Sequence, residues 1–122
     1  GSALYDYGDS VRFGVSTAAE DERDLTKVHV DMDLYRVFTQ GYLEGCSGSL
    51  TEAETALLPM GAKLMTLECG VRFLTDHLNG DHYFRISREE HNLHRCRTQF
   101  RLVQEMEDRW EEITQMIGET AG

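Results

Sequence analysis

The sequence is poor in the residues that mark secreted or membrane-embedded proteins. Its 122 residues include three cysteines, one proline and no run of about 18 consecutive apolar residues, the length that a membrane span needs. The odd cysteine count, without a Cys-x-x-Cys pair, argues against a disulfide framework and a zinc ribbon. The first residues lack the basic and then apolar order of a signal peptide. We therefore expect a cytoplasmic protein that does not enter a membrane.

Positive charge is also scarce. Twelve Lys and Arg residues stand against 22 Asp and Glu residues, which gives a formal net charge of -10 at pH 7. Binding to phosphate backbones or to anionic lipid surfaces depends on clustered Lys and Arg side chains. This balance argues against nucleic acid and membrane surfaces as partners. The length suits one domain and is too short for two ordinary ones.

Hydrophobic spacing at intervals of three and four residues predicts an all-α fold, and strand-like runs are almost absent. The expected helices span residues 31–45, 51–58, 60–79 and 88–117. On the first of them, Asp31 or Asp33 is available as the N-terminal cap. The predicted inward stripe of this helix consists of Leu34, Val37, Phe38, Tyr42 and Leu43.

Local signals set the expected helix boundaries. Residues 51–54 (TEAE) and 87–90 (SREE) both have the pattern of a capping box, in which two side chains satisfy free backbone donors of the first turn. Pro59 lacks an amide hydrogen and should break the chain near Leu58. Asn79-Gly80 supplies a helix stop. After the second box, the apolar spacing predicts one helix of more than about 25 residues, which is unusually long for a globular protein.

The first thirty residues carry two different expectations. Within residues 1–14, apolar residues alternate with polar ones, which by period alone indicates an extended segment. Asp6 or Asp9 would equally suit the start of a short helix there. Residues 15–30 contain the charged run from Glu20 to Asp24, which cannot bury a face. This stretch is expected to be a solvated surface loop.

Motifs for nucleotides and metal ions are absent or incomplete. The sequence has neither a GxxxxGKS/T loop nor a GxGxxG after a strand. His91 and His94, with Cys96 nearby, are too few for a metal site, which needs three or four converging ligands. Asp31 and Asp33 resemble a magnesium carboxylate pair, but acids before a helix more commonly cap it. No metal ligand is therefore assigned.

Arg72 lies in an otherwise apolar helical stretch. Its planar guanidinium is costly to bury without a partner and is suited to holding carboxylate, carbonyl or ligand oxygens. One interpretation is an ion pair with Asp76 one turn later, or with Asp6 or Asp9, and the residues alone favour it. The other is contact with a ligand.

Aromatic residues near a predicted turn leave a similar choice. Tyr83 and Phe84 follow the Asn79-Gly80 stop and would suit the wall of a sugar site. Aromatic residues after a turn more often enter the core. The same two interpretations apply to Phe13 and Tyr7.

Four segments resemble a known family. They are YDYGDSVRFG (5–14), GAKLMTLECG (61–70), RFLTD (72–76) and NLHRCRTQF (92–100). They are similar to the C-terminal portion of N-acetylhexosamine 1-kinases, members of the aminoglycoside phosphotransferase and choline kinase group with a protein-kinase-like fold. The resemblance covers nearly the whole chain. It implies ATP- and Mg²⁺-dependent transfer of the γ-phosphoryl group to the anomeric hydroxyl of N-acetylglucosamine or N-acetylgalactosamine.

The resemblance also implies roles for individual residues. Arg72 and Tyr83 would be polar contacts to the N-acetyl or ring oxygens of the sugar, and Phe13 would be an apolar wall of the same pocket. A second group would lie just past the metal-binding loop and brace it without binding the metal. This group consists of Asp6, Asp9 and Arg12.

The chain departs from the family in the parts that handle phosphate. The ATP-binding N-terminal lobe with its lysine, the catalytic-loop Asp and the magnesium-binding Asp-x-Asp have no counterpart here, and phosphoryl transfer depends on all three. Asp31-Met32-Asp33 is in the wrong place to replace the last of them. We therefore expect a fragment that holds the distal helices of the C-terminal lobe, binds neither ATP nor Mg²⁺ and is inactive alone.

The sequence leaves two other functions open. One is a non-catalytic helical interaction module, because apolar helix faces left exposed would also let the chain self-associate. The other is a mucin-desulfating enzyme, a description applied to some relatives. Sulfatase chemistry needs a modified Cys or Ser beside a calcium site, and Cys46, Cys69 and Cys96 have no such setting. Site chemistry therefore gives this label little support.

Overall fold

The computed structural model describes residues 3–46 and 49–121, and within them the fold is all-α, as predicted. A single isolated bridge, between Ser16 and Val30, is the only β pairing in these residues. No helix in this part of the chain is long and apolar enough to cross a membrane. The elements are α1 (Ala3–Gly14), a 3-10 helix η1 (Leu25–Lys27), α2 (Met32–Cys46), α3 (Glu52–Ala56), α4 (Leu58–Leu78), α5 (His91–Asp108) and α6 (Trp110–Ala121).

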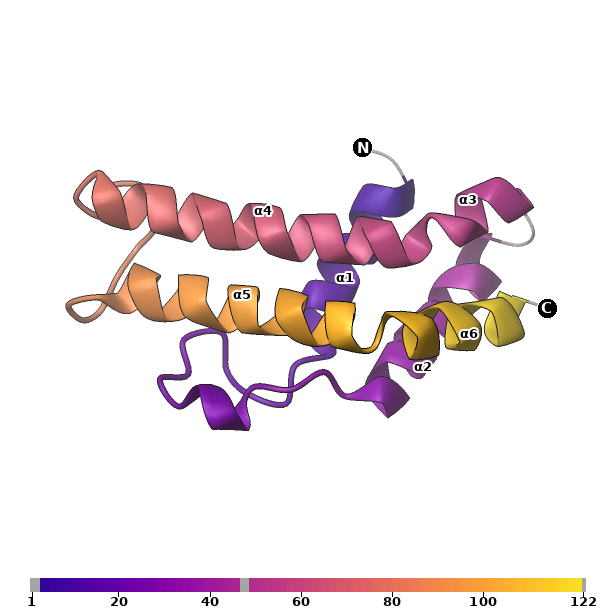
Figure 1. The fold of residues 1–122 in the computed structure, drawn as a ribbon. Helices are drawn as coiled ribbons and strands as arrows, with labels where there is room; N and C mark the ends of the chain where they lie inside the picture. Colours follow the sequence, from indigo (N-terminus) through magenta and orange to yellow (C-terminus); the bar gives the residue numbers. More distant parts are fainter. Residues whose placement is uncertain (1–2, 47–48, 122) are drawn as a thin grey trace.

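The long helices α4 and α5 lie side by side and run in opposite directions (Figure 1). Helix α6 continues beyond α5 and packs against α2 and α3. Helix α1 packs against both α4 and α2. The turn that joins α4 to α5 therefore lies at one end of the molecule, and α2, α3 and α6 lie at the other.

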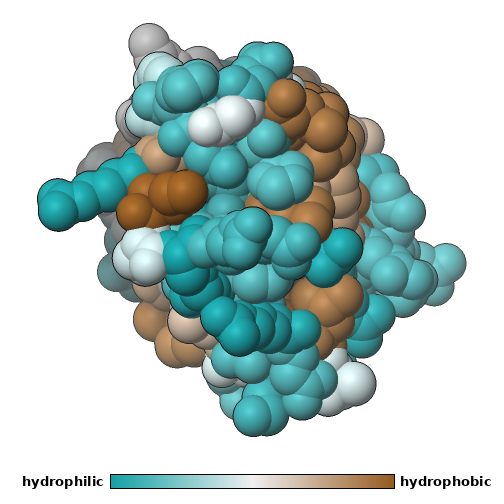
Figure 2. Space-filling model, turned by 90° about the vertical axis from the view of Figure 1, so that its left-hand side faces the viewer, coloured by the Kyte–Doolittle hydropathy of each residue, from teal (hydrophilic) through white to brown (hydrophobic). Residues whose placement is uncertain are grey.

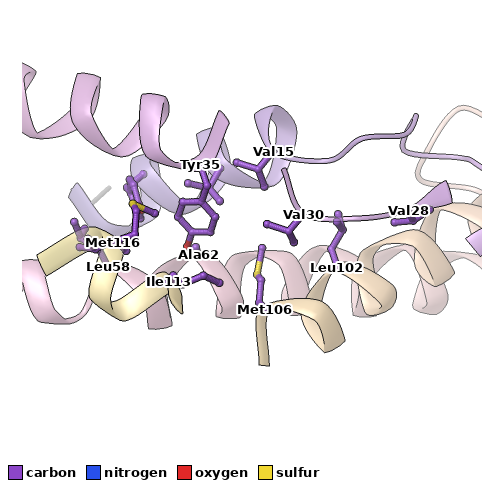
Figure 3. Packing of buried hydrophobic residues seen from close by; sticks show 13 residues of the cluster. Val15, Val28, Val30, Tyr35, Leu58, Ala62, Leu102, Met106, Ile113 and Met116 are labelled. Carbon is purple, nitrogen blue, oxygen red and sulfur yellow. The ribbon is translucent and has the colours of Figure 1, made fainter. Parts of the chain in front are cut away.

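The apolar core lies where α1, α2, α4 and the α5–α6 arm meet. Figure 3 shows Tyr35 of α2 and Ile113 of α6 pointing toward each other, and both side chains are fully buried. The Tyr7 hydroxyl is 2.7 Å from Thr39 Oγ1 in a buried hydrogen bond. Burial raises the pKa of Tyr7 to about 12. The core cluster comprises Tyr7, Val11, Val15, Val28, Val30, Tyr35, Leu58, Ala62, Leu102, Met106, Ile113, Met116 and Ile117.

Residues 3–14 form helix α1, so the extended interpretation is wrong there. The alternative of a helix is right, but its expected start at Asp6 or Asp9 is wrong, because the helix begins at Ala3. Tyr7 and Val11, four residues apart, form its buried face. Gly8 allows α1 to approach α4 closely. A Cβ at Gly8 would lie 2.7 Å from the Gly61 carbonyl oxygen and 2.6 Å from Met65 Cγ. The close packing of this segment against α4 therefore favours a helix, and the alternation of apolar and polar residues gave no sign of that packing.

Residues 15–30 are not simply a solvated loop. Val15 and Val28 are fully buried, and Val30 is 2% exposed. The Val30 amide donates to Glu105 Oε1 at 2.7 Å, and the Asp31 amide donates to the Val15 carbonyl at 2.7 Å. The first bond holds the segment against α5, and the second joins the two ends of the segment. In the charged run from Glu20 to Asp24, the predicted exposure to solvent is found only at the last residues, such as Arg23.

Helix α2 buries a different face from the one predicted. Tyr35 and Thr39 are fully buried, whereas Val37 is 61% exposed. The Thr39 hydroxyl bonds to Tyr7, so a polar position that hydropathy excluded belongs to the inner face. The predicted cap is confirmed, since Asp31 Oδ1 accepts from the amides of residues 33 and 34. Leu34 is 40% exposed, and Phe38 lies against Gly14 of α1 at the edge of the interface, while Tyr42 and Leu43 pack partly against the core.

The first predicted capping box and both predicted breaks are present. Thr51 and Glu54 exchange the two reciprocal hydrogen bonds of the box at the start of α3. Leu57 ends α3 and begins α4, so the chain breaks where Pro59 predicted it. Pro59 lies in the first turn of α4, where no intrahelical amide bond is needed. Gly80, with φ of +95°, follows the end of α4 as expected.

The second predicted capping box is wrong. Helix α5 begins at His91 after Glu90, which has φ of 60° and makes no side-chain capping bond. The amide of Ser87 instead donates to His91 Nδ1 at 3.1 Å. Residues 87–90 therefore form a turn tied to the His91 side chain.

The single helix predicted over 88–117 is divided at Arg109. This residue has φ of −106° and ends α5, and α6 begins at the next residue. The Arg109 guanidinium donates to the Val30 carbonyl at 3.2 Å, so the bend is held by the segment that packs beneath it. The bend lets α5 pack on α4 while α6 packs on α2 and α3.

Candidate functional site

A buried carboxylate fixes the turn between α4 and α5. Asp76 Oδ1 accepts from the Tyr83 amide at 2.7 Å, and Oδ2 accepts from the Phe84 amide at 3.0 Å. Asp76 Oδ2 also accepts from Asn92 Nδ2 at 2.7 Å. Asp76 is 6% exposed and Asn92 is fully buried. The carboxylate and the amide thus set the path of the chain that carries the two aromatic residues.

The charge of Asp76 is stabilised by these donors. Burial opposes its ionisation, but the amides of Phe84 and Tyr83 and the Asn92 side chain outweigh that effect and hold the pKa of Asp76 below its usual range. Asn92 Nδ2 also donates to Asp81 Oδ1 at 3.0 Å. Asp81 itself has φ of 61°, a conformation that Asp adopts more readily than most residues.

The aromatic residues after the turn form a short stack. The Phe84 and Phe73 ring centroids are 4.7 Å apart, and the Tyr83 and Phe84 ring centroids are 4.9 Å apart in a T-shaped arrangement. Phe73 is buried, whereas Tyr83 is 75% exposed. The Arg95 guanidinium lies 5.6 Å from the centre of the Phe73 ring. Phe84 thus links a buried ring to an exposed one.

Arg72 is exposed, and its guanidinium makes no hydrogen bond or ion pair with any residue that the structure describes. The predicted pair with Asp76 is wrong, because both oxygens of that carboxylate are taken by other donors. The predicted pair with Asp9 is also wrong: Asp9 instead lies 3.4 Å from Arg12. Water can solvate Arg72, so the expected need for a buried counter-charge does not arise.

Two hollows of the surface meet at Arg72 and Phe84. One, of about 400 Å³, lies over the turn, and the other, of about 350 Å³, lies toward α1 and α5. The first is lined by Arg72, Thr75, Asp76, Asn79, Tyr83 and Phe84. The second is lined by Arg12, Glu20, Cys69, Arg72, Phe73, Phe84, Arg85 and Arg95. Figure 2 views the end of the molecule with the turn, where hydrophilic side chains cover most of the surface.

Ion pairs connect several residues that line the second hollow. Arg12 lies 2.8 Å from Glu20 and 3.4 Å from Asp9. Glu20 also lies 3.9 Å from Arg95, which donates to the Arg85 carbonyl at 3.0 Å. Glu20 thus connects α1 to α5.

The structure brings some of the predicted site residues together. Arg72 and Tyr83 line the same hollow, and Arg12 lines the neighbouring one. Asp9 is half-buried beside Arg12. The side chains of Asp6 and Phe13 lie outside the described part of the chain.

Sequence reasoning missed several residues that shape the site. Asn92 and the pair Glu20–Arg95 had no local signal, because each depends on segments that are distant in the sequence. Arg85 follows the aromatic pair directly and was not singled out. Asp76 had a usable signal: a carboxylate three residues before the Asn79-Gly80 helix stop is well placed to bond to backbone amides of the following turn.

The histidine pair singled out in the sequence has other partners. His91 Nε2 is 2.7 Å from Asp21 Oδ2, and Arg88 is 3.2 Å from the same oxygen. The hydrogen bond from His91, despite partial burial and with help from the charge of Arg88, lowers the pKa of Asp21. His94 Nδ1 accepts from Arg88 at 3.3 Å, and Cys96 is buried. These contacts fasten the charged loop to α5.

Within 3–46 and 49–121, no group of three or more His, Cys, Asp or Glu side chains is placed to hold a metal ion. Comparison with protein-family models gives no match to the chain.

Proposed function

We propose that this chain is the sugar-binding helical part of an ATP-dependent phosphotransferase with a protein-kinase-like fold. The parent enzyme would phosphorylate the anomeric hydroxyl of N-acetylglucosamine or N-acetylgalactosamine. The proposal joins the sequence resemblance, which supplies the reaction, to the hollow beside Arg72, which supplies a place for the sugar.

One observation carries the proposal: the Arg72 guanidinium has no partner among the described residues and shares a hollow with Tyr83 and Phe84. A guanidinium offers directed donors that suit carbonyl and ring oxygens. Exposed aromatic side chains combine an apolar ring with, in tyrosine, a polar tip. A sugar presents both oxygen atoms and apolar faces, so it suits such a surface.

The turn supports this role because its shape does not depend on a ligand. Asp76 and Asn92 fix the backbone of Tyr83 and Phe84 through buried hydrogen bonds. Contacts that are already in place reduce the entropy lost when a ligand binds. The phosphate-handling half of the proposed enzyme lies outside this set of residues, so no chemical step is assigned to them.

The test is a calorimetric titration of the chain with N-acetylglucosamine. Arg72→Ala should weaken binding by about 1.5–3 kcal/mol, the range for losing a charged hydrogen bond. Arg36→Ala is the matched control, because Arg36 is exposed on α2 and lines neither hollow. Absence of sugar binding by the unaltered chain, or equal affinity of both variants, would contradict the proposal.

An activity measurement tests the second part. Incubation of the chain with ATP, Mg²⁺ and N-acetylglucosamine should yield no sugar phosphate, because a phosphoryl transfer site needs groups that hold ATP and metal. Turnover would show that the assignment of these groups to another part of the enzyme is wrong.

A helical interaction module is the second candidate, favoured by one face of α4. Leu57, just before the helix, begins a run of apolar residues with heptad spacing, typical of a helix that pairs with another. Its exposed members are Leu57, Met60, Leu64, Leu67, Val71 and Leu78. Self-association measured by sedimentation, in a chain that binds no amino sugar, would favour this candidate.

A further inference from the structure

The second hollow concentrates positive charge in an acidic protein. The formal net charge of the chain is -10, yet four arginines and one glutamate line this hollow. Two of the arginines are balanced. Arg12 pairs with Asp9 and Glu20, and Arg95 lies 3.9 Å from Glu20, so two guanidinium groups face two carboxylates.

The other two arginines have no such balance. Among the described residues, the guanidinium groups of Arg72 and Arg85 make no hydrogen bond or ion pair, and both are exposed. Asp76 lines the adjoining hollow, but its carboxylate is satisfied by two backbone amides and the Asn92 amide. The hollow therefore offers two positive charges and unused donors toward solvent.

The remaining lining is apolar or neutral. Phe73 and Phe84 form one wall, with their ring centroids 4.7 Å apart. Cys69 lies beside them, and burial raises the pKa of its thiol, so it remains uncharged near neutral pH. Two guanidinium groups beside an apolar wall suit an anion attached to a larger ring.

We infer that Arg72 and Arg85 form an oxyanion subsite that takes the phosphate of a phosphorylated sugar. A phosphate monoester carries nearly two negative charges at pH 7 and three strong acceptor oxygens, which matches two unbalanced guanidinium groups. Arg72 lines both hollows, so one ligand would place its sugar over the turn and its phosphate toward Arg85. The inference rests on the proposed sugar-binding function and specifies that the sugar carries a negatively charged phosphate group.

The position of the phosphate on the sugar follows from the proposed reaction. The anomeric hydroxyl is the acceptor, so a substrate would carry its phosphate elsewhere, whereas a product carries it at the anomeric carbon. N-Acetylglucosamine 6-phosphate represents such a substrate, and N-acetylglucosamine 1-phosphate represents the product. Inorganic phosphate tests whether the subsite binds a phosphate anion that is not attached to a sugar.

The experiment compares these three phosphates with N-acetylglucosamine by calorimetric titration of the full chain. At least one sugar phosphate should bind about tenfold more tightly than the neutral sugar, and Arg85→Ala should remove that advantage. Arg85→Ala should leave the affinity for the neutral sugar unchanged. Arg36→Ala should alter neither, and thermal unfolding followed by circular dichroism verifies that each variant is folded.

The outcomes separate the inference from the proposed function. If the neutral sugar binds as tightly as both sugar phosphates, the oxyanion subsite is wrong and the sugar site stands. If the phosphates bind through Arg85 and the neutral sugar does not bind, the subsite stands and the proposed function fails. If inorganic phosphate binds as tightly as either ester, a sugar phosphate is the wrong ligand class. If nothing binds, both are overturned.

Discussion

The two ends of the molecule are held together by different forces. At the α6 end, Tyr35 and Ile113 belong to a packed apolar core. At the end with the α4–α5 turn, Asp76 and Asn92 bond to each other and to the backbone. Burial of apolar area favours folding without fixing direction, whereas buried hydrogen bonds fix direction but contribute little net free energy. The first end should therefore determine stability and the second the shape of the ligand site.

The largest effect is expected from a cavity at the apolar end. Ile113→Ala removes a fully buried side chain and should lower the free energy of unfolding by about 2–5 kcal/mol. Urea denaturation measures the change. Val37→Ala, at a side chain that is 61% exposed, is the control and should change stability by less than about 0.5 kcal/mol.

A smaller loss of stability is expected at the polar end. Asn92→Ala removes the donor shared by Asp76 and Asp81 and should cost about 1–3 kcal/mol, the range for leaving a buried polar group unsatisfied. Amide hydrogen exchange should increase at residues 83 and 84 more than in α6. Equal increases at both ends would show that the turn is not a separate unit.

The pH dependence of the free energy of unfolding gives a second test of the Asn92→Ala variant. The native pKa of Asp76 is lowered, so the stability gained from its ionisation is complete above about pH 3.9, the ordinary carboxyl value. It is lost as the pH falls through the lower native pKa. Because Asn92 contributes to the lowering, Asn92→Ala should lose less stability in acid than the unaltered chain. A parallel pH dependence would contradict this account.

The smallest expected effect is a difference in stability between substitutions in the two segments that share the capping-box pattern. Thr51→Ala removes a capping bond that is present and should cost about 1 kcal/mol. Ser87→Ala should cost almost nothing, because residues 87–90 do not cap α5. Thermal unfolding of the two variants measures the difference. An equal loss would mean that the Ser87 hydroxyl stabilises α5 in some other way.

The sequence was most informative where structure is local. The cap at Thr51, the break before Pro59 and the stop at Gly80 all depend on residues within a few positions of each other. Two boundaries failed because distant residues decide them. The bend at Arg109 is held by Val30, and His91, which holds the turn before α5, is itself bonded to the distant Asp21.

The site was foreseen only in part for the same reason. Arg72 and Tyr83 were singled out, and they line one hollow. Arg95 and Glu20 could not be paired from the sequence, because their contact requires the charged loop to fold onto α5. Exposure was also misjudged, since the apolar neighbours of Arg72 suggested burial while its own side chain faces solvent.

The bend at Arg109 separates two helices of one continuous stretch of chain, of which α5 packs on α4 and α6 packs on α2 and α3. An α-helix turns by about 100° per residue, so inserting a single residue there would rotate everything after it by that amount. Ile113, Met116 and Ile117 would leave the interior, while the groups around Arg72 would keep their places. A single-residue insertion at this joint should therefore destabilise the protein more than one beside the exposed Arg23.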